Sequence, residues 1–212
     1  MPLELNAFAA ARPYLYHLTD STNLPGILAC GRLSCTERLL TDGGRSDLLD
    51  RPRRGMTEVQ VDGRRVAVRD QDPLHAGNIE FEAGWTFARF VRHLNRYVFF
   101  WPGTVRGPND YGVRHFARYR RSGPVLIRIP FTSVVDTGAT PLFCRFNSGS
   151  PRCSRGLRSP RGSRTFLLAG FFGEGAQRVV EVVFEDSILL PGSIESATDP
   201  AGPWQPLFVP ER

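Results

Sequence analysis

A histidine and several hydrogen-bonding side chains lie close together near the start of the chain, in "YLYHLTDSTN". His17 ends a short alternating strand predicted over residues 14–17, and Thr19 and Asn23 follow within six positions. An imidazole can hold a ribose hydroxyl or an amide through one ring nitrogen. In the alternative interpretation His17 bonds to backbone and Asn23 is only the N-cap of the next helix. The residues by themselves leave both interpretations open.

A carboxylate stands inside a valine-rich strand near the other end of the chain, in "QRVVEVVFEDSI". Strand alternation places Glu181 on the same face as Val179 and Val183. An ionised carboxylate is costly to bury without a partner. Glu181 is therefore either an edge residue that faces water or a catalytic carboxylate that faces a cleft.

Two further segments offer groups that suit a nucleotide. "VRDQ" places Arg69, Asp70 and Gln71 after a strand, where the planar guanidinium of Arg69 suits a phosphate and Asp70 can orient it. The alternative is a surface Arg–Asp pair. "LNRYVFFW" supplies Tyr97 and Phe99, one of which can stack on a planar ligand at the strand edge, although aromatic runs usually belong to a core.

The basic residues are all arginine. The chain has 27 of them, no lysine, a formal net charge of +6 and a pI of about 9.7. An arginine-only composition is typical of GC-rich bacterial coding. Two segments concentrate this charge, a predicted helix over residues 107–123 and a segment over residues 146–166. They predict a basic groove for nucleic acid, with a solvated loop as the alternative. The residues we expect to contact nucleic acid are Arg118, Arg121, Arg152, Arg155 and Arg158.

The remaining pattern predicts a mixed α+β protein with one domain over residues 1–212, a leading segment over 1–12 and a Pro/Gly-rich surface tail over 190–212. A Gly31 C-cap and an Asp62-Gly63 turn are the clearest local signals. Helices are predicted over 2–11, 24–30, 36–42, 84–96 and 107–123. Strands are predicted over 14–17, 59–68 as a hairpin, 97–101, 124–131, 133–138 and, as the last strand, 177–188.

Cysteine spacing and hydropathy exclude several protein classes. Cys30, Cys35, Cys144 and Cys153 form no CxxC pair, so we expect reduced thiols and no metal site. The N-terminal residues lack a signal-peptide pattern, and no apolar run is long enough to span a membrane. The sequence has neither a P-loop nor GxGxxG. A cytoplasmic protein without membrane contact is expected.

Several of these motifs together resemble a known family. "LYHLTDSTNLPGILACGRLS" is similar to the opening of the DarT-type DNA ADP-ribosyltransferases. "VRDQDPL", "LNRYVFFW", "FNSGSPR" and "VVEVVFEDSILLP" resemble an uncharacterised, DarT-related bacterial family, so that the resemblance spans residues 14–191. It implies an ADP-ribosyltransferase-like fold, in which two packed, mostly antiparallel sheets form a cleft with helices around it. NAD would lie in that cleft as substrate, and no metal is needed.

The resemblance also implies roles for individual residues. His17 matches the histidine that holds the ribose and nicotinamide side of NAD, and Glu181 matches the catalytic glutamate. Arg69 is the nearest match to the arginine that grips the pyrophosphate and orients the acceptor, although this chain has "VRDQ" in place of the family's Arg-Asn-Arg. The expected contacts to NAD are His17, Thr19, Asn23, Arg69, Gln71, Tyr97 and Phe99, and the expected catalytic residues are Glu181 and Arg69.

The expected reaction passes through an oxocarbenium-like centre at the ribose carbon, which a carboxylate stabilises. We expect an NAD-dependent ADP-ribosyltransferase that modifies a base of single-stranded DNA or RNA, with DNA favoured. A toxin or phage-defence role with an antitoxin or immunity partner would fit. The alternatives are a protein or small-molecule acceptor, and a non-catalytic basic module that binds nucleic acid.

Overall fold

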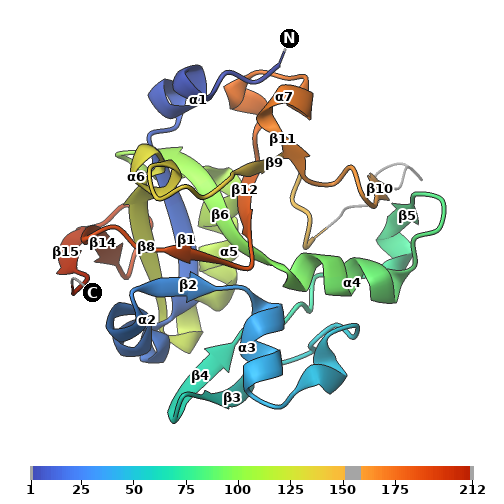
Figure 1. The fold of residues 1–212 in the computed structure, drawn as a ribbon, viewed down its shortest axis with the longest axis horizontal. Coiled ribbons are helices and arrows are strands. Elements are labelled where there is room, and N and C mark those ends of the chain that lie inside the picture. Colours follow the sequence, from blue (N-terminus) through green and yellow to red (C-terminus); the bar gives the residue numbers. More distant parts are fainter. Residues whose placement is uncertain (1, 151–158, 211–212) are drawn as a thin grey trace.

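One antiparallel sheet, with nine strands among the described residues, organises the molecule (Figure 1). The structure is a computed structural model, and it describes residues 2–150 and 159–210. Strand β7 (Gly107–Pro108) pairs only with β6. The other strands follow in the spatial order β11 (Leu167–Leu168), β9 (Leu142–Cys144), β12 (Glu181–Glu185), β6 (Tyr97–Thr104), β1 (Tyr14–Asp20), β8 (Pro124–Pro130), β14 (Ser193–Ala197) and β15 (Gln205–Phe208).

Strand β6 joins two halves of this sheet. Its first half, Tyr97 to Phe100, pairs with β12, and its second half, from Trp101 onward, pairs with β1 and β7. Strands β12 and β1, which lie on opposite sides of β6, therefore each leave it near its middle. The predicted class, mixed α+β with mostly antiparallel sheets, is confirmed, and the two expected sheets are continuous through β6.

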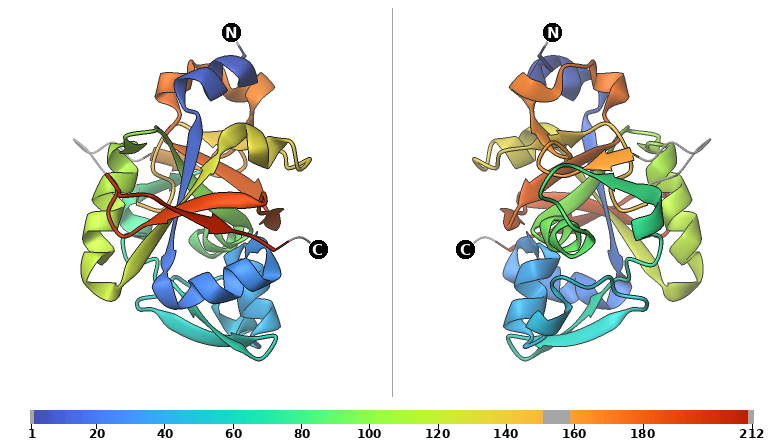
Figure 2. Two further views of the ribbon diagram at one scale, coloured as in Figure 1. Left: turned by 90° about the vertical axis from the view of Figure 1, so that its left-hand side faces the viewer. Right: turned by 90° about the vertical axis from the view of Figure 1, so that its right-hand side faces the viewer.

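Within the described residues, seven short α-helices surround the sheet (Figures 1 and 2). Helices α1 and α7 lie side by side at one end, where Leu3 N–H donates to Ala169 O. Helix α3 and the β3–β4 hairpin lie at the opposite end. The described helices are α1 (Leu5–Ala11), α2 (Leu24–Cys30), α3 (Thr36–Asp42), α4 (Phe87–Asn95), α5 (Asp110–Tyr119), α6 (Phe131–Val135) and α7 (Ala169–Phe172). None of them is long and apolar enough to cross a lipid bilayer.

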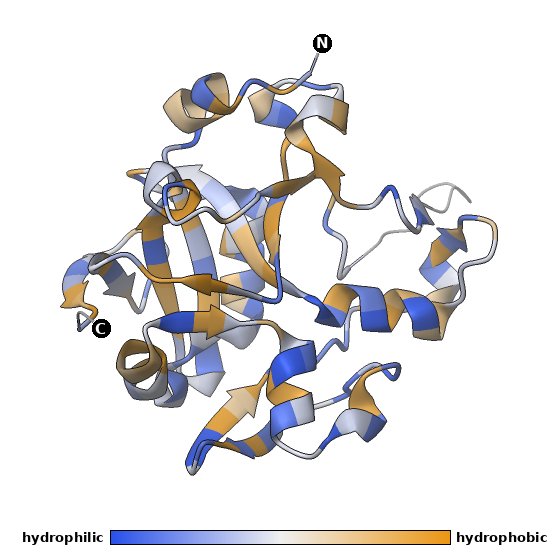
Figure 3. Cartoon of the chain, in the orientation of Figure 1, coloured by the Kyte–Doolittle hydropathy of each residue, from blue (hydrophilic) through white to orange (hydrophobic). Residues whose placement is uncertain are grey.

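Three small strand pairs complete the fold. They are β2 (Arg32–Ser34) with β13 (Ser187–Leu189), β3 (Thr57–Val61) with β4 (Arg64–Val68), and the parallel pair β5 (Ile79–Phe81) with β10 (Ser159–Arg161). The hydrophobic core lies along the central strands, several of which carry runs of hydrophobic residues in Figure 3. Phe8, Phe100, Phe143 and Val182 are fully buried there. Phe8 shows that the leading segment packs into the core.

The turn and the helix cap that were predicted from glycine-containing motifs are present in the structure. Asp62 and Gly63 have φ of 51° and 71°, which is the left-handed pair that a two-residue hairpin requires. Gly31 has φ 55° at the end of α2, as a left-handed cap requires. The helices over 36–42 and within 84–96 are also confirmed.

Three predictions were wrong because tertiary packing overrode local preference. Residues 133–138 are not a strand: α6 occupies this region because Phe131 and Val134 are buried at helical spacing. The strand predicted over 177–188 is divided, since Asp186 has φ 59° between β12 and β13. It is also not the last strand. The tail adds β14 and β15 to the main sheet instead of only covering the surface.

Candidate active site

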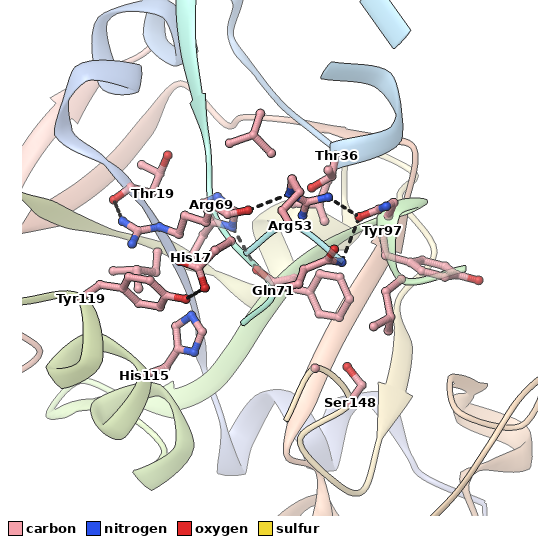
Figure 4. A pocket seen from close by; sticks show the side chains of 18 of the residues that line it. His17, Thr19, Thr36, Arg53, Arg69, Gln71, Tyr97, His115, Tyr119 and Ser148 are labelled. Atoms are coloured by element: carbon pink, nitrogen blue, oxygen red, sulfur yellow. Dashed lines mark hydrogen bonds between the residues drawn. The ribbon is translucent and has the colours of Figure 1, made fainter. Parts of the chain in front are cut away.

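One pocket brings together residues from distant parts of the chain (Figure 4). Its walls come from β1, β6 and β12, from the segment after β4, from α5 and from the loop after β9. All eight residues that the sequence assigned to catalysis or NAD binding line it. They are His17, Thr19, Asn23, Arg69, Gln71, Tyr97, Phe99 and Glu181.

The pocket lies where β1 and β12 leave β6. Tyr16 is the last residue of β1 that pairs with β6, opposite Trp101, and His17 follows it. Val182 is the first residue of β12 that pairs with β6, opposite Phe100, and Glu181 precedes it. The divergence of the two strands therefore opens the cavity between His17 and Glu181.

Glu181 is a buried carboxylate in the cavity wall. Only 4% of it is exposed, and β12 lies between β9 and β6, so the interpretation of Glu181 as a water-facing edge residue is wrong. The Ser148 N–H donates to Oε2 at 3.1 Å, and Glu181 forms no ion pair with any described residue. Burial raises the pKa of Glu181 to about 7, against the opposing effects of Ser148 and the Arg161 charge. Such a group can both accept a proton and carry charge near neutral pH.

His17 is a neutral imidazole with a defined tautomer. Nδ1 lies 2.9 Å from the carbonyl oxygen of Phe99, which can only accept, so Nδ1 carries the proton. Nε2 is then a hydrogen-bond acceptor. Burial lowers the pKa of His17 to about 4, so the ring stays neutral at physiological pH. The hydrogen bond from His17 to the backbone, which the alternative interpretation expected, is present. The same ring also lines the pocket.

Arg69 is partly buried with unused hydrogen-bonding capacity. Its Nη2 donates to Thr19 O at 2.6 Å, and its guanidinium lies 4.7 Å from the ring centre of Tyr119. Nε and Nη1 are buried and have no hydrogen-bond partner among the described residues. The alternative, a surface pair with Asp70, does not form, and Asp70 instead accepts from the Tyr119 hydroxyl at 2.8 Å. Arg69 therefore keeps two N–H groups, Nε and Nη1, that an anionic ligand can use as donors.

A second buried arginine was missed by the sequence interpretation. Arg53 is 6% exposed, and it donates to Arg69 O at 2.8 Å and to Asn95 Oδ1 at 3.1 Å. Burial lowers its pKa to about 10. Gln71 Nε2 donates to the same Asn95 oxygen, and Gln71 Oε1 is buried without a partner among the described residues. The guanidinium groups of Arg53 and Arg69 donate to carbonyl and amide oxygens and form no ion pair with a described carboxylate. Their positive charges therefore favour an anionic ligand in the pocket. Nothing in "DRPRRG" distinguishes Arg53 from its exposed neighbours Arg51 and Arg54.

Helix α5 supplies an aromatic wall that the sequence did not indicate. His115 lies 4.7 Å from the ring of Trp101 and 4.9 Å from the ring of Tyr119, and all three line the pocket. The helix approaches β6 closely at Gly112, where a Cβ atom would lie 3.0 Å from Trp101. Burial lowers the pKa of His115 to about 4, so this ring is also neutral. From the sequence of this helix only its arginine-rich, basic side had been predicted.

Tyr97 and Phe99 differ in their access to the pocket. Tyr97 is 7% exposed and packs against the rings of His93 and Phe166 at 5.2 and 4.8 Å. Phe99 is only partly buried, and its ring centre lies 5.8 Å from that of Phe166. Phe99 is therefore the better candidate for stacking on a ligand.

Asn23 does not act as the predicted helix cap. It has helical backbone angles and makes no capping hydrogen bond. Its amide instead donates to Thr19 Oγ1 at 3.1 Å and to Ala67 O at 2.8 Å, and it accepts from Ala67 N–H at 2.8 Å. These bonds join the turn after β1 to β4, directly before Arg69.

We expect Asn23→Ala to lower the free energy of unfolding by about 2 kcal/mol, because it leaves both backbone groups of Ala67 without partners. Urea denaturation of the purified variant measures this. Thr86→Ala is the matched control, since Thr86 is an exposed cap whose side chain accepts from Arg89 N–H, and the loss of this bond costs about 1 kcal/mol or less. Equal losses in the two variants would contradict a linking role for Asn23.

The predicted nucleic-acid residues are only partly described. The side chain of Arg118 is exposed on α5, where it pairs with Asp72, and Arg121 is exposed in the following 3-10 turn, Arg120–Ser122. Arg152, Arg155 and Arg158 lie outside the described residues. Within residues 2–150 and 159–210, no three metal-ligating side chains gather at one point.

Comparison with known proteins finds a family model and similar solved structures. The model of a family described as "Family of unknown function (DUF7002)" matches residues 13–190. No curated protein matches the chain. The structure titled "Thermus sp. 2.9 DarT in complex with NAD+" has 13% identity and a TM-score of 0.38, and the alignment covers 84% of this chain and 77% of that one. The corresponding values for "Thermus sp. 2.9 DarT in complex with ADP-ribosylated ssDNA" are 13%, 0.40, 86% and 80%.

Proposed function

The chain belongs to the DUF7002 family of unknown function, and from its pocket we propose that it is an NAD-dependent ADP-ribosyltransferase that releases nicotinamide. One observation carries the proposal: a buried carboxylate that forms no ion pair with any described residue shares a cavity with a neutral histidine, the buried Arg53 and the partly buried Arg69. This set matches the charges of NAD, which has an anionic pyrophosphate and a ribose carbon that becomes positive during the reaction.

The pyrophosphate is bound by Arg69, whose Nε and Nη1 are unused, with Arg53 adding a second positive charge. His17 accepts a hydrogen bond from a ribose hydroxyl through Nε2, the nitrogen that its Phe99 contact leaves unprotonated. Phe99 offers a ring for nicotinamide. These contacts orient the nicotinamide ribose toward Glu181.

Glu181 acts on the reacting carbon. The bond between C1′ of the ribose and the nicotinamide nitrogen breaks, and its electron pair leaves with nicotinamide, which departs neutral and needs no proton. The ionised carboxylate stabilises the oxocarbenium-like centre. The acceptor then forms a bond to C1′ and passes its proton to Glu181, which releases it to water.

The acceptor we propose is a base of single-stranded nucleic acid, with DNA favoured. Arg118 and Arg121 extend from the outer side of the α5 region, while His115 and Tyr119 of the same helix line the pocket. Together with the net charge of +6, this supports a strand bound along α5 with one base turned inward. A toxin or phage-defence role with an antitoxin or immunity partner is part of the same proposal, and arrest of bacterial growth on expression would test the toxicity.

The experiment is incubation of the purified protein with NAD labelled in its adenylate phosphate. Parallel reactions contain single-stranded DNA, RNA or whole-cell protein, and nicotinamide release is measured in each. We expect label in DNA that disappears with Glu181→Gln. Label only in protein would select the protein-acceptor alternative. No label, no nicotinamide and no NAD binding would favour the non-catalytic nucleic-acid-binding module.

A further inference from the structure

Arg161, at the end of β10, is a buried cation that the proposed mechanism does not use. It is 1% exposed and forms no ion pair with any described residue. Its guanidinium lies 3.8 Å from the ring centre of Phe146, Nη1 donates to Pro160 O at 3.1 Å, and Nη2 lies 3.4 Å from Asn147 O. Burying a guanidinium without a carboxylate is costly, so this placement calls for a physical reason.

The contact with Asn147 leads directly to Glu181. The carbonyl of Asn147 and the N–H of Ser148 belong to the same planar peptide unit. Arg161 donates to the oxygen of this unit, Asn147 O. The N–H of the same unit, which belongs to Ser148, donates to Glu181 Oε2 at 3.1 Å. A cation on the carbonyl polarises the peptide and strengthens the bond that its N–H donates. Arg161 therefore acts on the carboxylate through one peptide unit.

The backbone of Arg161 is anchored on its other side. The Glu82 carboxylate accepts from Ser163 N–H at 2.9 Å and from Arg164 N–H at 3.2 Å, which fixes the turn that follows Arg161. Strand β10 also pairs with β5. The guanidinium thus projects from a fixed support toward the loop that carries Ser148.

We propose that Arg161 is the positioning residue for Glu181, which it orients through the Asn147–Ser148 peptide. The proposal rests on the proposed catalytic role of Glu181. It adds that the place and the protonation of this carboxylate depend on a side chain that does not line the pocket.

Direct titration of Glu181 tests this without NAD. The carboxyl signal is followed by NMR in protein with 13C-labelled glutamate and is assigned with Glu181→Gln. We expect Arg161→Gln to raise the titration midpoint by about 0.5 to 1 pH unit, because the charged carboxylate loses a nearby cation and a well-held donor. Phe146→Leu, which removes the ring beneath the guanidinium, should raise it by a smaller amount.

Arg145→Gln is the matched control, since Arg145 precedes the same loop but is exposed and pairs with Glu174. Its midpoint should equal that of the wild type. An unchanged or lowered midpoint in folded Arg161→Gln overturns the proposal. If Arg161→Gln does not fold, the midpoint of Phe146→Leu decides, and an unchanged value there overturns the proposal. Where the wild type consumes NAD, the pH profile of the rate should shift with the midpoint. A wild type that consumes no NAD would contradict the proposed function, while the titration would still decide the role of Arg161.

Discussion

Replacing Glu181 with glutamine is expected to abolish nicotinamide release and, at the same time, to stabilise the protein above pH 7. The catalytic loss should be at least about 10³-fold, because the amide can neither carry negative charge nor take a proton from the acceptor. The fold should persist, since the glutamine oxygen can still accept from the Ser148 N–H.

The gain in stability follows from the raised pKa. Burial raises the pKa of Glu181 from 4.5 to about 7, so the folded protein holds this proton more tightly than the unfolded chain. Below pH 4.5 both states are protonated and the carboxylate costs nothing. Between pH 4.5 and 7 the unfolded chain ionises while the folded protein keeps its proton, so the folded state loses about 3 kcal/mol relative to the unfolded chain, since one pH unit corresponds to about 1.4 kcal/mol. Glutamine has no proton to lose in either state, so the variant does not lose this stability.

Urea denaturation of wild type and Glu181→Gln from pH 4.5 to pH 8 measures this effect. The difference in unfolding free energy should be near zero at the acid end and reach its full value above pH 7. Glu185→Gln is the control on the same strand, because Glu185 is exposed and pairs with Arg96. A difference in unfolding free energy that does not change with pH would show that burial does not raise the pKa of Glu181. Retained nicotinamide release in the variant would exclude Glu181 as the catalytic group.

Replacing Arg69 with methionine is expected to weaken NAD binding about 100-fold, or about 2.7 kcal/mol. Methionine keeps an unbranched side chain beside Tyr119 but removes the positive charge and the two unused donors, Nε and Nη1. Arg69→Lys should recover only part of the affinity, because an ammonium cannot make the bidentate contact of a guanidinium with phosphate. Isothermal titration calorimetry with NAD measures both variants.

Two controls separate lost charge from lost structure. Binding of adenosine, which has no phosphate, should be the same in wild type and Arg69→Met. Arg118→Met, on the exposed side of α5, should leave NAD binding unchanged. An equal loss of adenosine and NAD binding would mean that the pocket had collapsed. Unchanged NAD binding in Arg69→Met would show that Arg69 does not hold the pyrophosphate.

Sequence determined the features that depend on residue type and on neighbours in the chain. The Asp62-Gly63 hairpin and the Gly31 cap follow from backbone conformations that few residues adopt. His17, Arg69 and Glu181 drew attention because polar groups stood at strand ends or inside an apolar strand. Motif similarity added an expected role for each, and all three line one pocket.

Tertiary structure decided what depends on partners far away in the sequence. Glu181 faces a cavity and not water because β9 pairs beside β12, and no local pattern contains that pairing. Asn23 could equally have been a cap, and its bonds to Ala67, 44 positions away, settle its role. Arg53, His115 and Arg161 resemble many other residues in the sequence. Only burial distinguishes them, because desolvation and the scarcity of partners are properties of the folded chain.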